Sequence, residues 1–192
     1  MGTVRVVLIT ACCLAASASI GAQSRAPWPV LAVSSADLDV WRAAVEQIRR
    51  DSQFRSSRLA ILNQTIAFDS IREHLHETQL KDALIQRLLE QNPVSVRFPV
   101  SLRVPPFRIL DLDQFRDHYG RFEWDRFDRF TSSERMWRVS VSRPGFSDDG
   151  MRAIVYTVTS PRRFEGLRGN GFIFEKFDGQ WVLCERFATW IS

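Results

Sequence analysis

Cysteine is scarce in this chain of 192 residues, which contains three. Two of them, Cys12 and Cys13, lie in an apolar segment near the N-terminus, so the chain that follows has only Cys184 and cannot form a disulfide within itself. A domain without disulfides depends on its hydrophobic core, and about 170 residues are enough to build one. Cys184 falls in an apolar run, where we expect its thiol to be buried.

Histidine, lysine and long runs of one charge are also scarce. There are three histidines and two lysines, Lys81 and Lys176, so the cations are almost all arginine. Acidic residues are interspersed with the arginines and leave no single-sign stripe for a nucleic-acid backbone to follow. The sequence has neither a G-x-S-x-G elbow nor a cysteine placed with a histidine, which excludes the common hydrolase nucleophiles. We therefore expect no nucleic-acid partner and no cofactor, and we assign no catalytic residue.

The first 22 residues have the layout of a secretory signal peptide. Arg5 supplies the positive charge, residues 6–20 form an apolar run of about 15 residues, and two small residues ending in Ala22 follow. The run is shorter than the roughly 20 residues that a membrane-spanning helix needs. We predict cleavage after Ala22, an extended leader over residues 23–33, and an exported single domain over residues 34–192 without a transmembrane span.

An alternative concerns residues 9–12, Ile-Thr-Ala-Cys, which are similar to a bacterial lipobox. In that case Cys12 would become the lipidated first residue and anchor the protein to a membrane. Only about six apolar residues precede Cys12, fewer than the 7 to 15 of a signal peptide's apolar region. We therefore expect cleavage without lipidation and keep the lipoprotein as the alternative.

Two amphipathic helices are predicted in the N-terminal half. Apolar residues at helical spacing predict the first helix over residues 36–51, with the preceding serines as candidate N-caps. A wide leucine stripe predicts the second over residues 79–91. The short apolar run over residues 59–65 between them predicts a strand. Each helix needs a sheet against which it can bury its apolar face.

The middle of the chain is punctuated by proline and rich in aromatic residues. Four prolines predict an extended segment or edge strand over residues 94–103. Short helices are predicted over residues 111–119, where Asp111 can act as N-cap, and over residues 123–130. The aromatic residues between 115 and 130 are interleaved with arginines, as in a stacking platform, but their helical spacing favours packing in the core.

The C-terminal half has the alternating pattern of antiparallel strands. Strands are predicted over residues 137–141, 151–159, 172–177 and 180–190. Asp178-Gly179 predicts a tight hairpin turn, since a type I′ turn needs a positive φ at both central residues. The predicted fold class is α+β, with N-terminal amphipathic helices packed on a C-terminal antiparallel β-meander.

A His-x-His pair is the sharpest candidate for a metal site. His74 and His76 would point the same way in an extended chain, and His118 is the third imidazole. Catalytic zinc needs three protein ligands and a water, so these histidines, or two of them and a carboxylate, would have to converge. The alternative function is accordingly a metal-dependent hydrolase that uses His74 and His76. A polar connector between two elements is the simpler interpretation.

Residues 166–171, Gly-Leu-Arg-Gly-Asn-Gly, form a candidate anion-binding loop. Glycines let backbone N–H groups approach an anion, and Arg162, Arg163 and Arg168 add positive charge. A strand is predicted to follow, so the helix N-terminus of a phosphate-binding loop is missing. We predict that a ligand would be bound by these three arginines with Gly169 and Gly171, and a flexible connector between strands is the alternative.

The portion from about Phe107 to Ser192 resembles a group of uncharacterised exported bacterial proteins. The resemblance is carried by Ser142-Arg143-Pro144-Gly145-Phe146, Gly169-Asn170-Gly171, Asp178-Gly179-Gln180-Trp181 and Thr189-Trp190-Ile191-Ser192. It implies an export signal and one small domain, and it brings no activity. The group often has a cysteine in the glycine loop, where this chain has Arg168. Sequence and resemblance together point to a non-catalytic exported domain that binds a protein or an anionic ligand, or that is associated with the cell envelope.

Overall fold

The structure of the protein is a computed structural model that describes residues 32–51, 54, 58–73, 75, 79–99, 107–160 and 166–191. The predicted signal peptide, the alternative lipid-anchored Cys12 and most of the predicted leader lie outside these residues. None of the helices in the described part combines the length and the hydropathy that crossing a membrane requires.

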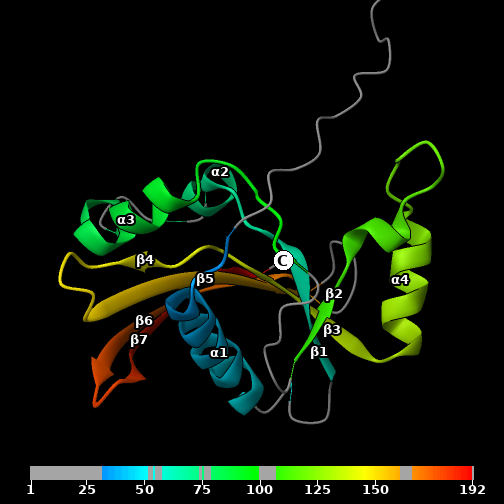
Figure 1. The fold of residues 1–192 in the computed structure, drawn as a ribbon. Helices are drawn as coiled ribbons and strands as arrows, with labels where there is room; N and C mark the ends of the chain where they lie inside the picture. Colours follow the sequence, from blue (N-terminus) through cyan, green and yellow to red (C-terminus); the bar gives the residue numbers. More distant parts are fainter. Residues whose placement is uncertain are drawn as a thin grey trace, which may run out of the picture.

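A seven-stranded sheet forms the centre of the fold, with the strand order β2-β1-β3-β5-β6-β7 and with β4 paired to β5 (Figure 1). The strands are β1 (Arg58–Thr65), β2 (Arg108–Leu110), β3 (Met136–Val141), β4 (Gly145–Phe146), β5 (Arg152–Ser160), β6 (Arg168–Phe177) and β7 (Gln180–Ile191). The helices are α1 (Ser35–Arg50), α2 (Phe68–Arg72), α3 (Ala83–Gln91) and α4 (Trp124–Ser133), with the 3-10 helices η2 (Gln79–Lys81) and η3 (Leu112–Phe115). The fold class is α+β, as predicted.

The sheet is mixed, whereas we predicted an antiparallel meander alone. β1 lies parallel to both β2 and β3, while β3, β5, β6 and β7 are antiparallel to one another in succession. The parallel pairs arise because the chain crosses over through helices: α2 and α3 separate β1 from β2, and α4 separates β2 from β3. The predicted meander therefore accounts for only part of the sheet, from β3 to β7.

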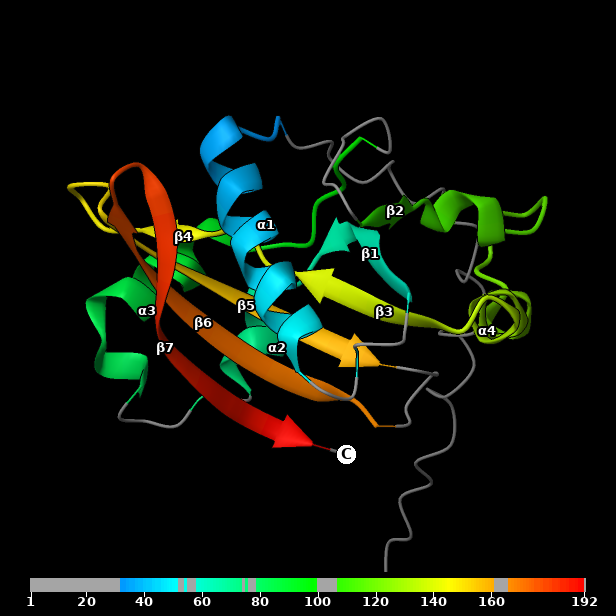
Figure 2. The same ribbon diagram turned by 90° about the horizontal axis from the view of Figure 1, so that it is seen from below.

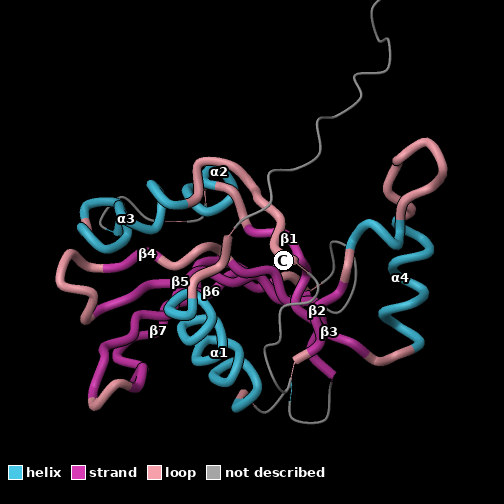
Figure 3. The backbone as a smooth tube through the Cα atoms, viewed as in Figure 1, coloured by secondary structure: helices cyan, strands magenta, loops and turns pink. Residues whose placement is uncertain are grey.

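Helices cover both faces of the sheet, as the two ribbon views and the tube drawing show (Figures 1, 2 and 3). α1 lies on one face, where Trp41 and Ile48 join strand residues such as Phe172 in one core cluster. α2 and α3 lie on the other face, where Leu88 joins Tyr156 in a second cluster. We call these the α1 face and the α3 face.

α1 begins and ends within one residue of its predicted bounds. A capping box determines where it begins. The hydroxyl of Ser34 accepts a hydrogen bond from the Asp37 N–H at 3.1 Å, and the Asp37 carboxylate accepts one from the Ser34 N–H at 3.0 Å. Further along the helix, the indole N–H of the fully buried Trp41 donates to the carbonyl of Ser142 at 2.8 Å. This bond ties α1 to the chain directly after β3.

The aromatic segment between β2 and β3 packs mostly in the core, as predicted. Phe115 and Phe127 are buried, with ring centroids 5.0 Å apart, and belong to a third cluster beneath α4. Tyr119 and Trp124 are the exceptions, with exposed fractions of 73% and 40%. The segment therefore packs α4 against the edge of the sheet that β2 and β1 form.

Four local predictions differ from the structure. The helix predicted over residues 79–91 is divided into η2 and α3, because Asp82 has an extended backbone and caps α3 with its side chain. The predicted helix over 111–119 is only the short η3: Asp111 caps its start as predicted, but the chain is already extended at Arg116, which forms a bridge with Phe122. The described part of the segment 94–103 contributes an isolated bridge, Gln64 to Arg97, in place of a strand. Cys184 is exposed, because β7 is an edge strand whose register against β6 shifts beside this residue.

Candidate functional site

The glycines of the predicted anion-binding loop lie in a strand. Arg168, Gly169 and Gly171 belong to β6, which begins earlier than predicted, and Arg162 and Arg163 lie outside the described residues. The absence of a side chain at Gly171 has a packing reason, because a Cβ there would lie 2.0 Å from Cζ of Phe187. Arg168 is therefore the residue of this prediction from which a site can be built.

The neighbours of Arg168 follow from the pairing of β5 and β6. Arg168 lies directly opposite Thr159, and Asn170 lies directly opposite Thr157. Opposite residues in an antiparallel pair point to the same face, with their Cβ atoms about 5 Å apart. The next pair along the two strands belongs to the apolar core under α1. These four polar side chains therefore continue the α1 face beyond its apolar core.

Three polar atoms of this group are buried and have no hydrogen-bond partner among the residues that the structure describes. They are Oγ1 of Thr157, Oγ1 of Thr159 and Nε of Arg168. The two threonines are 0% and 1% exposed. Leaving a buried polar group unpaired costs about 1–3 kcal/mol, and native proteins nearly always satisfy such groups through protein, water or a ligand. We call these three residues the threonine–arginine cluster.

Arg186 of β7 and Asp51 at the end of α1 lie at the rim of the cluster. Nε and Nη2 of Arg186 donate to Oδ1 of Asn170 at 3.2 and 3.0 Å, and the guanidinium lies 5.4 Å from the ring centroid of Phe172. Nη2 of Arg186 is also 3.6 Å from Oδ2 of Asp51. Arg186 is thereby held in place next to the cluster, with part of its side chain exposed.

Nε of Arg138 in the same sheet is also buried without a hydrogen-bond partner among the described residues, but the rest of this guanidinium is held by α4. Its side chain is 5% exposed, Nη1 donates to Oδ1 of Asp128 at 2.7 Å, and its guanidinium lies 5.0 Å from the ring centroid of Phe127. Burial lowers the pKa of Arg138, and the nearby charge of Asp128 opposes that shift. Because both contacts come from α4, we assign Arg138 the role of anchoring α4 to β3.

The predicted metal site falls largely outside the described residues, since His74 and His76 are not among them. His118 precedes Tyr119 in the segment between η3 and α4, and the two ring centroids are 3.8 Å apart. Within the described ranges, no three histidine, cysteine, aspartate or glutamate side chains gather closely enough to hold a metal ion. The metal hypothesis therefore stays a sequence-based prediction.

The sequence pattern predicted Arg168 as a ligand-binding residue but gave no such prediction for Thr157 and Thr159. Threonine is a common strand residue, so its occurrence in a predicted strand raises no question by itself. A signal was nevertheless present, because both threonines follow Ala153 and Val155 at a spacing of two and thus share their buried face. Two hydroxyls on the inward face of a central strand need hydrogen-bond partners.

No protein-family model, no curated protein and no solved structure matches this chain.

Proposed function

We propose that this protein is an exported, non-catalytic binding domain whose ligand carries an oxyanion, and that the threonine–arginine cluster holds this group. The observation that carries the proposal is the set of three buried, unpartnered polar atoms side by side on β5 and β6. Two hydroxyls and a guanidinium can all donate to one ligand, and an oxyanion such as phosphate offers several acceptor atoms at once. Export is supported by the signal-like first 22 residues.

The charges around the cluster favour an anion over a neutral ligand. Arg168 and Arg186 bring two positive charges. Asp51 brings one negative charge, and it is paired with Arg186. The side chains of Arg186 and Asp51 are 37% and 25% exposed, so the rim of the cluster is in contact with solvent. Arg162 and Arg163, close before β6 in the sequence, stay part of the proposed site.

The same groups favour binding over catalysis. A threonine hydroxyl is a weak nucleophile unless a neighbouring base takes its proton. A guanidinium cannot act as that base, and the carboxylate of Asp51 is engaged by Arg186. The cluster is therefore equipped to donate hydrogen bonds and not to transfer protons.

Replacing Thr157 and Thr159 by valine removes the two hydroxyls and keeps the shape of the side chains. We expect the double variant T157V/T159V to bind inorganic phosphate at least about tenfold more weakly than the unchanged protein, since a hydrogen bond to a charged group contributes about 1.5–3 kcal/mol. Its free energy of unfolding without phosphate should stay the same or rise, because two buried unpartnered hydroxyls are gone. Calorimetric titration with phosphate and urea denaturation measure the two quantities.

Thr65→Val is the matched control for this experiment. Thr65 is also buried, at 2% exposed, but its hydroxyl accepts a hydrogen bond from the Val96 N–H at 2.9 Å. The control should lose stability and keep its affinity for phosphate. Equal phosphate affinities in the double variant and the unchanged protein would overturn the proposal, and so would a titration without binding heat.

A further inference from the structure

A second arginine with unpaired donors, Arg97, lies far from the threonine–arginine cluster in the sheet order, beside the end of β1. Its segment is fastened to β1 by backbone hydrogen bonds from Thr65 N to Val96 O at 2.9 Å and from Phe98 N to Asn63 O at 3.2 Å. The Arg97 side chain is 10% exposed. The backbone on both sides of Arg97 is therefore fixed, and most of the side chain is buried.

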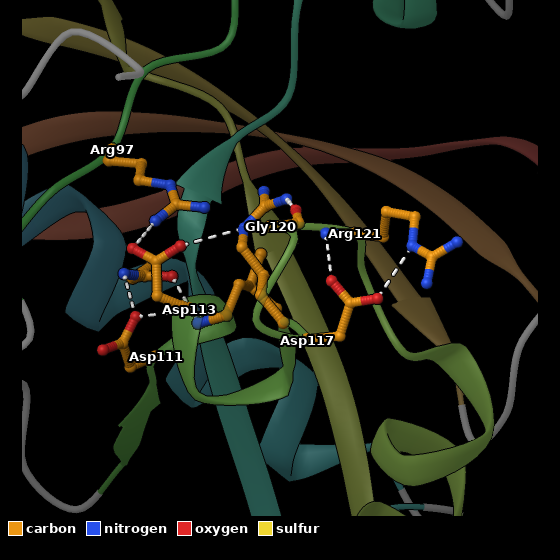
Figure 4. Close-up of polar contacts among 9 residues, drawn as sticks. Arg97, Asp111, Asp113, Asp117, Gly120 and Arg121 are labelled. Carbon is orange, nitrogen blue, oxygen red and sulfur yellow. Dashed lines mark hydrogen bonds and ion pairs between the residues drawn. The ribbon is translucent and has the colours of Figure 1, made fainter. Parts of the chain in front are cut away.

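One edge of the Arg97 guanidinium is unpaired. Nη1 donates to Oδ2 of Asp113, and Figure 4 shows the two groups facing each other. Nε and Nη2 are buried and have no hydrogen-bond partner within the described part of the chain. The Nε–H and Nη2–H bonds lie on the same edge of the planar group and run parallel, which is the fork that binds a carboxylate through two hydrogen bonds. Arg97 therefore has both donors that the binding of one carboxylate requires.

The surroundings of Arg97 are held rigid by further polar contacts (Figure 4). Nε of Arg116 donates to Oδ1 of Asp113 at 3.0 Å, and Nη1 of Arg116 donates to the carbonyl of Gly120 at 2.7 Å. On the other side, Asn63 donates from Nδ2 to Oδ1 of Asp111 at 3.1 Å and accepts at Oδ1 from the Leu112 N–H at 3.0 Å. Donors that are already fixed lose little conformational freedom when a ligand binds.

We propose that the free edge of Arg97 is a binding site for a single carboxylate group, on a small molecule or at the end of a peptide. The carboxylate of Asp113 lies against the same guanidinium, so a doubly charged phosphate is disfavoured by repulsion, and a planar group with one charge fits better. Asp113 is 55% exposed and Arg116 is 24% exposed, so the surface next to Arg97 is in contact with solvent. This site is independent of the proposed function, which rests on residues of β5 and β6.

Titration of the isotope-labelled chain with acetate, followed by NMR of the arginine Nε–H groups, tests this assignment. We expect a saturable shift of the Arg97 Nε–H resonance. Arg97→Lys should weaken acetate binding by about tenfold or more, because lysine keeps the charge and loses the fork. Asp113→Asn should strengthen it severalfold, because a neighbouring negative charge is removed. If Arg97 had only a structural role, Asp113→Asn would leave the affinity for acetate unchanged.

Two further measurements show whether the response is specific to Arg97 and whether the ligand is a small acid or a peptide end. Arg121→Lys is the matched control, since Nε of Arg121 already donates to Asp117 at 2.8 Å and its side chain is 75% exposed, so acetate binding should not change.

N-acetylglycine, a minimal peptide terminus, should bind more tightly than acetate if the ligand is a peptide and equally if it is a small acid, whereas N-acetylglycinamide should not bind.

Phosphate binding should survive in the Arg97→Lys variant, so the failure of one site does not count against the other. The carboxylate site would be overturned by an acetate response confined to other arginines. Unchanged acetate affinity in both Arg97→Lys and Asp113→Asn would overturn it as well, and if Arg97→Lys does not fold, Asp113→Asn alone decides.

Discussion

Replacing Trp41 by alanine is expected to lower the free energy of unfolding by about 3–5 kcal/mol. The side chain is fully buried, its ring centroid lies 4.9 Å from that of Phe98, and its indole N–H donates to the carbonyl of Ser142 at 2.8 Å. The substitution therefore removes the largest fully buried side chain of the core and the hydrogen bond between α1 and the end of β3. Since domains of this size are stable by only about 5–15 kcal/mol, we expect a variant close to unfolding.

Trp41→Phe separates the two contributions. Phenylalanine keeps an aromatic ring against Phe98 and leaves the carbonyl of Ser142 without its donor, so a smaller loss of about 1–3 kcal/mol is expected. Urea denaturation with an unchanged slope measures both variants. A loss below about 1 kcal/mol for Trp41→Ala would contradict the position of α1 on the sheet.

Gly145→Ala is expected to lower the free energy of unfolding by about 3 kcal/mol. A Cβ at Gly145 would lie 2.4 Å from N and 2.7 Å from Cα of Leu88, and 2.9 Å from the carbonyl carbon of Arg87. These are backbone atoms of α3, which cannot rotate away, so either the helix or β4 would have to move. The close approach of α3 to β4 depends on this glycine.

Gly150→Ala is the control for Gly145→Ala. Gly150 has a φ of 66° in the turn between β4 and β5, and a Cβ there meets no atom within 4 Å. Alanine in this conformation costs about 1–2 kcal/mol through backbone strain alone. Thermal or urea unfolding should rank Gly145→Ala well below Gly150→Ala in stability, and the reverse order would contradict the packing of α3 on β4.

The parts of the fold that sequence predicts correctly are those set by neighbouring residues. α1 follows from its capping box and its apolar spacing. The hairpin between β6 and β7 follows from Asp178 and Gly179, whose φ values of 48° and 78° are both positive, as a type I′ turn requires. In each case the conformation is determined within a few residues.

The arrangement of the sheet could not be predicted in this way. The apolar run of β1 indicates a strand, but alternation says nothing about which strands lie beside it or in which direction. The parallel pairing of β1 with β3 joins segments far apart in the chain, such as Leu59 with Trp137. Crossovers through helices of marginal length, such as α2, give too weak a signal to reveal this topology.

The two proposed sites differ from the sequence-based one for the same reason. Arg168 was identified from the glycines and arginines close to it in the sequence, whereas the threonines beside it in the folded chain come from a different strand. The carboxylate site brings Arg97 to Asp113 from separate segments, and the burial that leaves its fork unpaired exists only in the folded chain. Gly145 and Gly171, two glycines of the motifs that carry the resemblance, have packing roles.

The central claim is that the threonine–arginine cluster holds an oxyanion, and crystals grown in selenate test it most directly, because the anomalous signal of selenium locates the ion. We predict an anomalous peak for a selenate ion whose oxygen atoms lie within hydrogen-bond distance of Oγ1 of Thr159 and Nε of Arg168. Density for water alone between these atoms, with selenate only at exposed arginines, would contradict the claim.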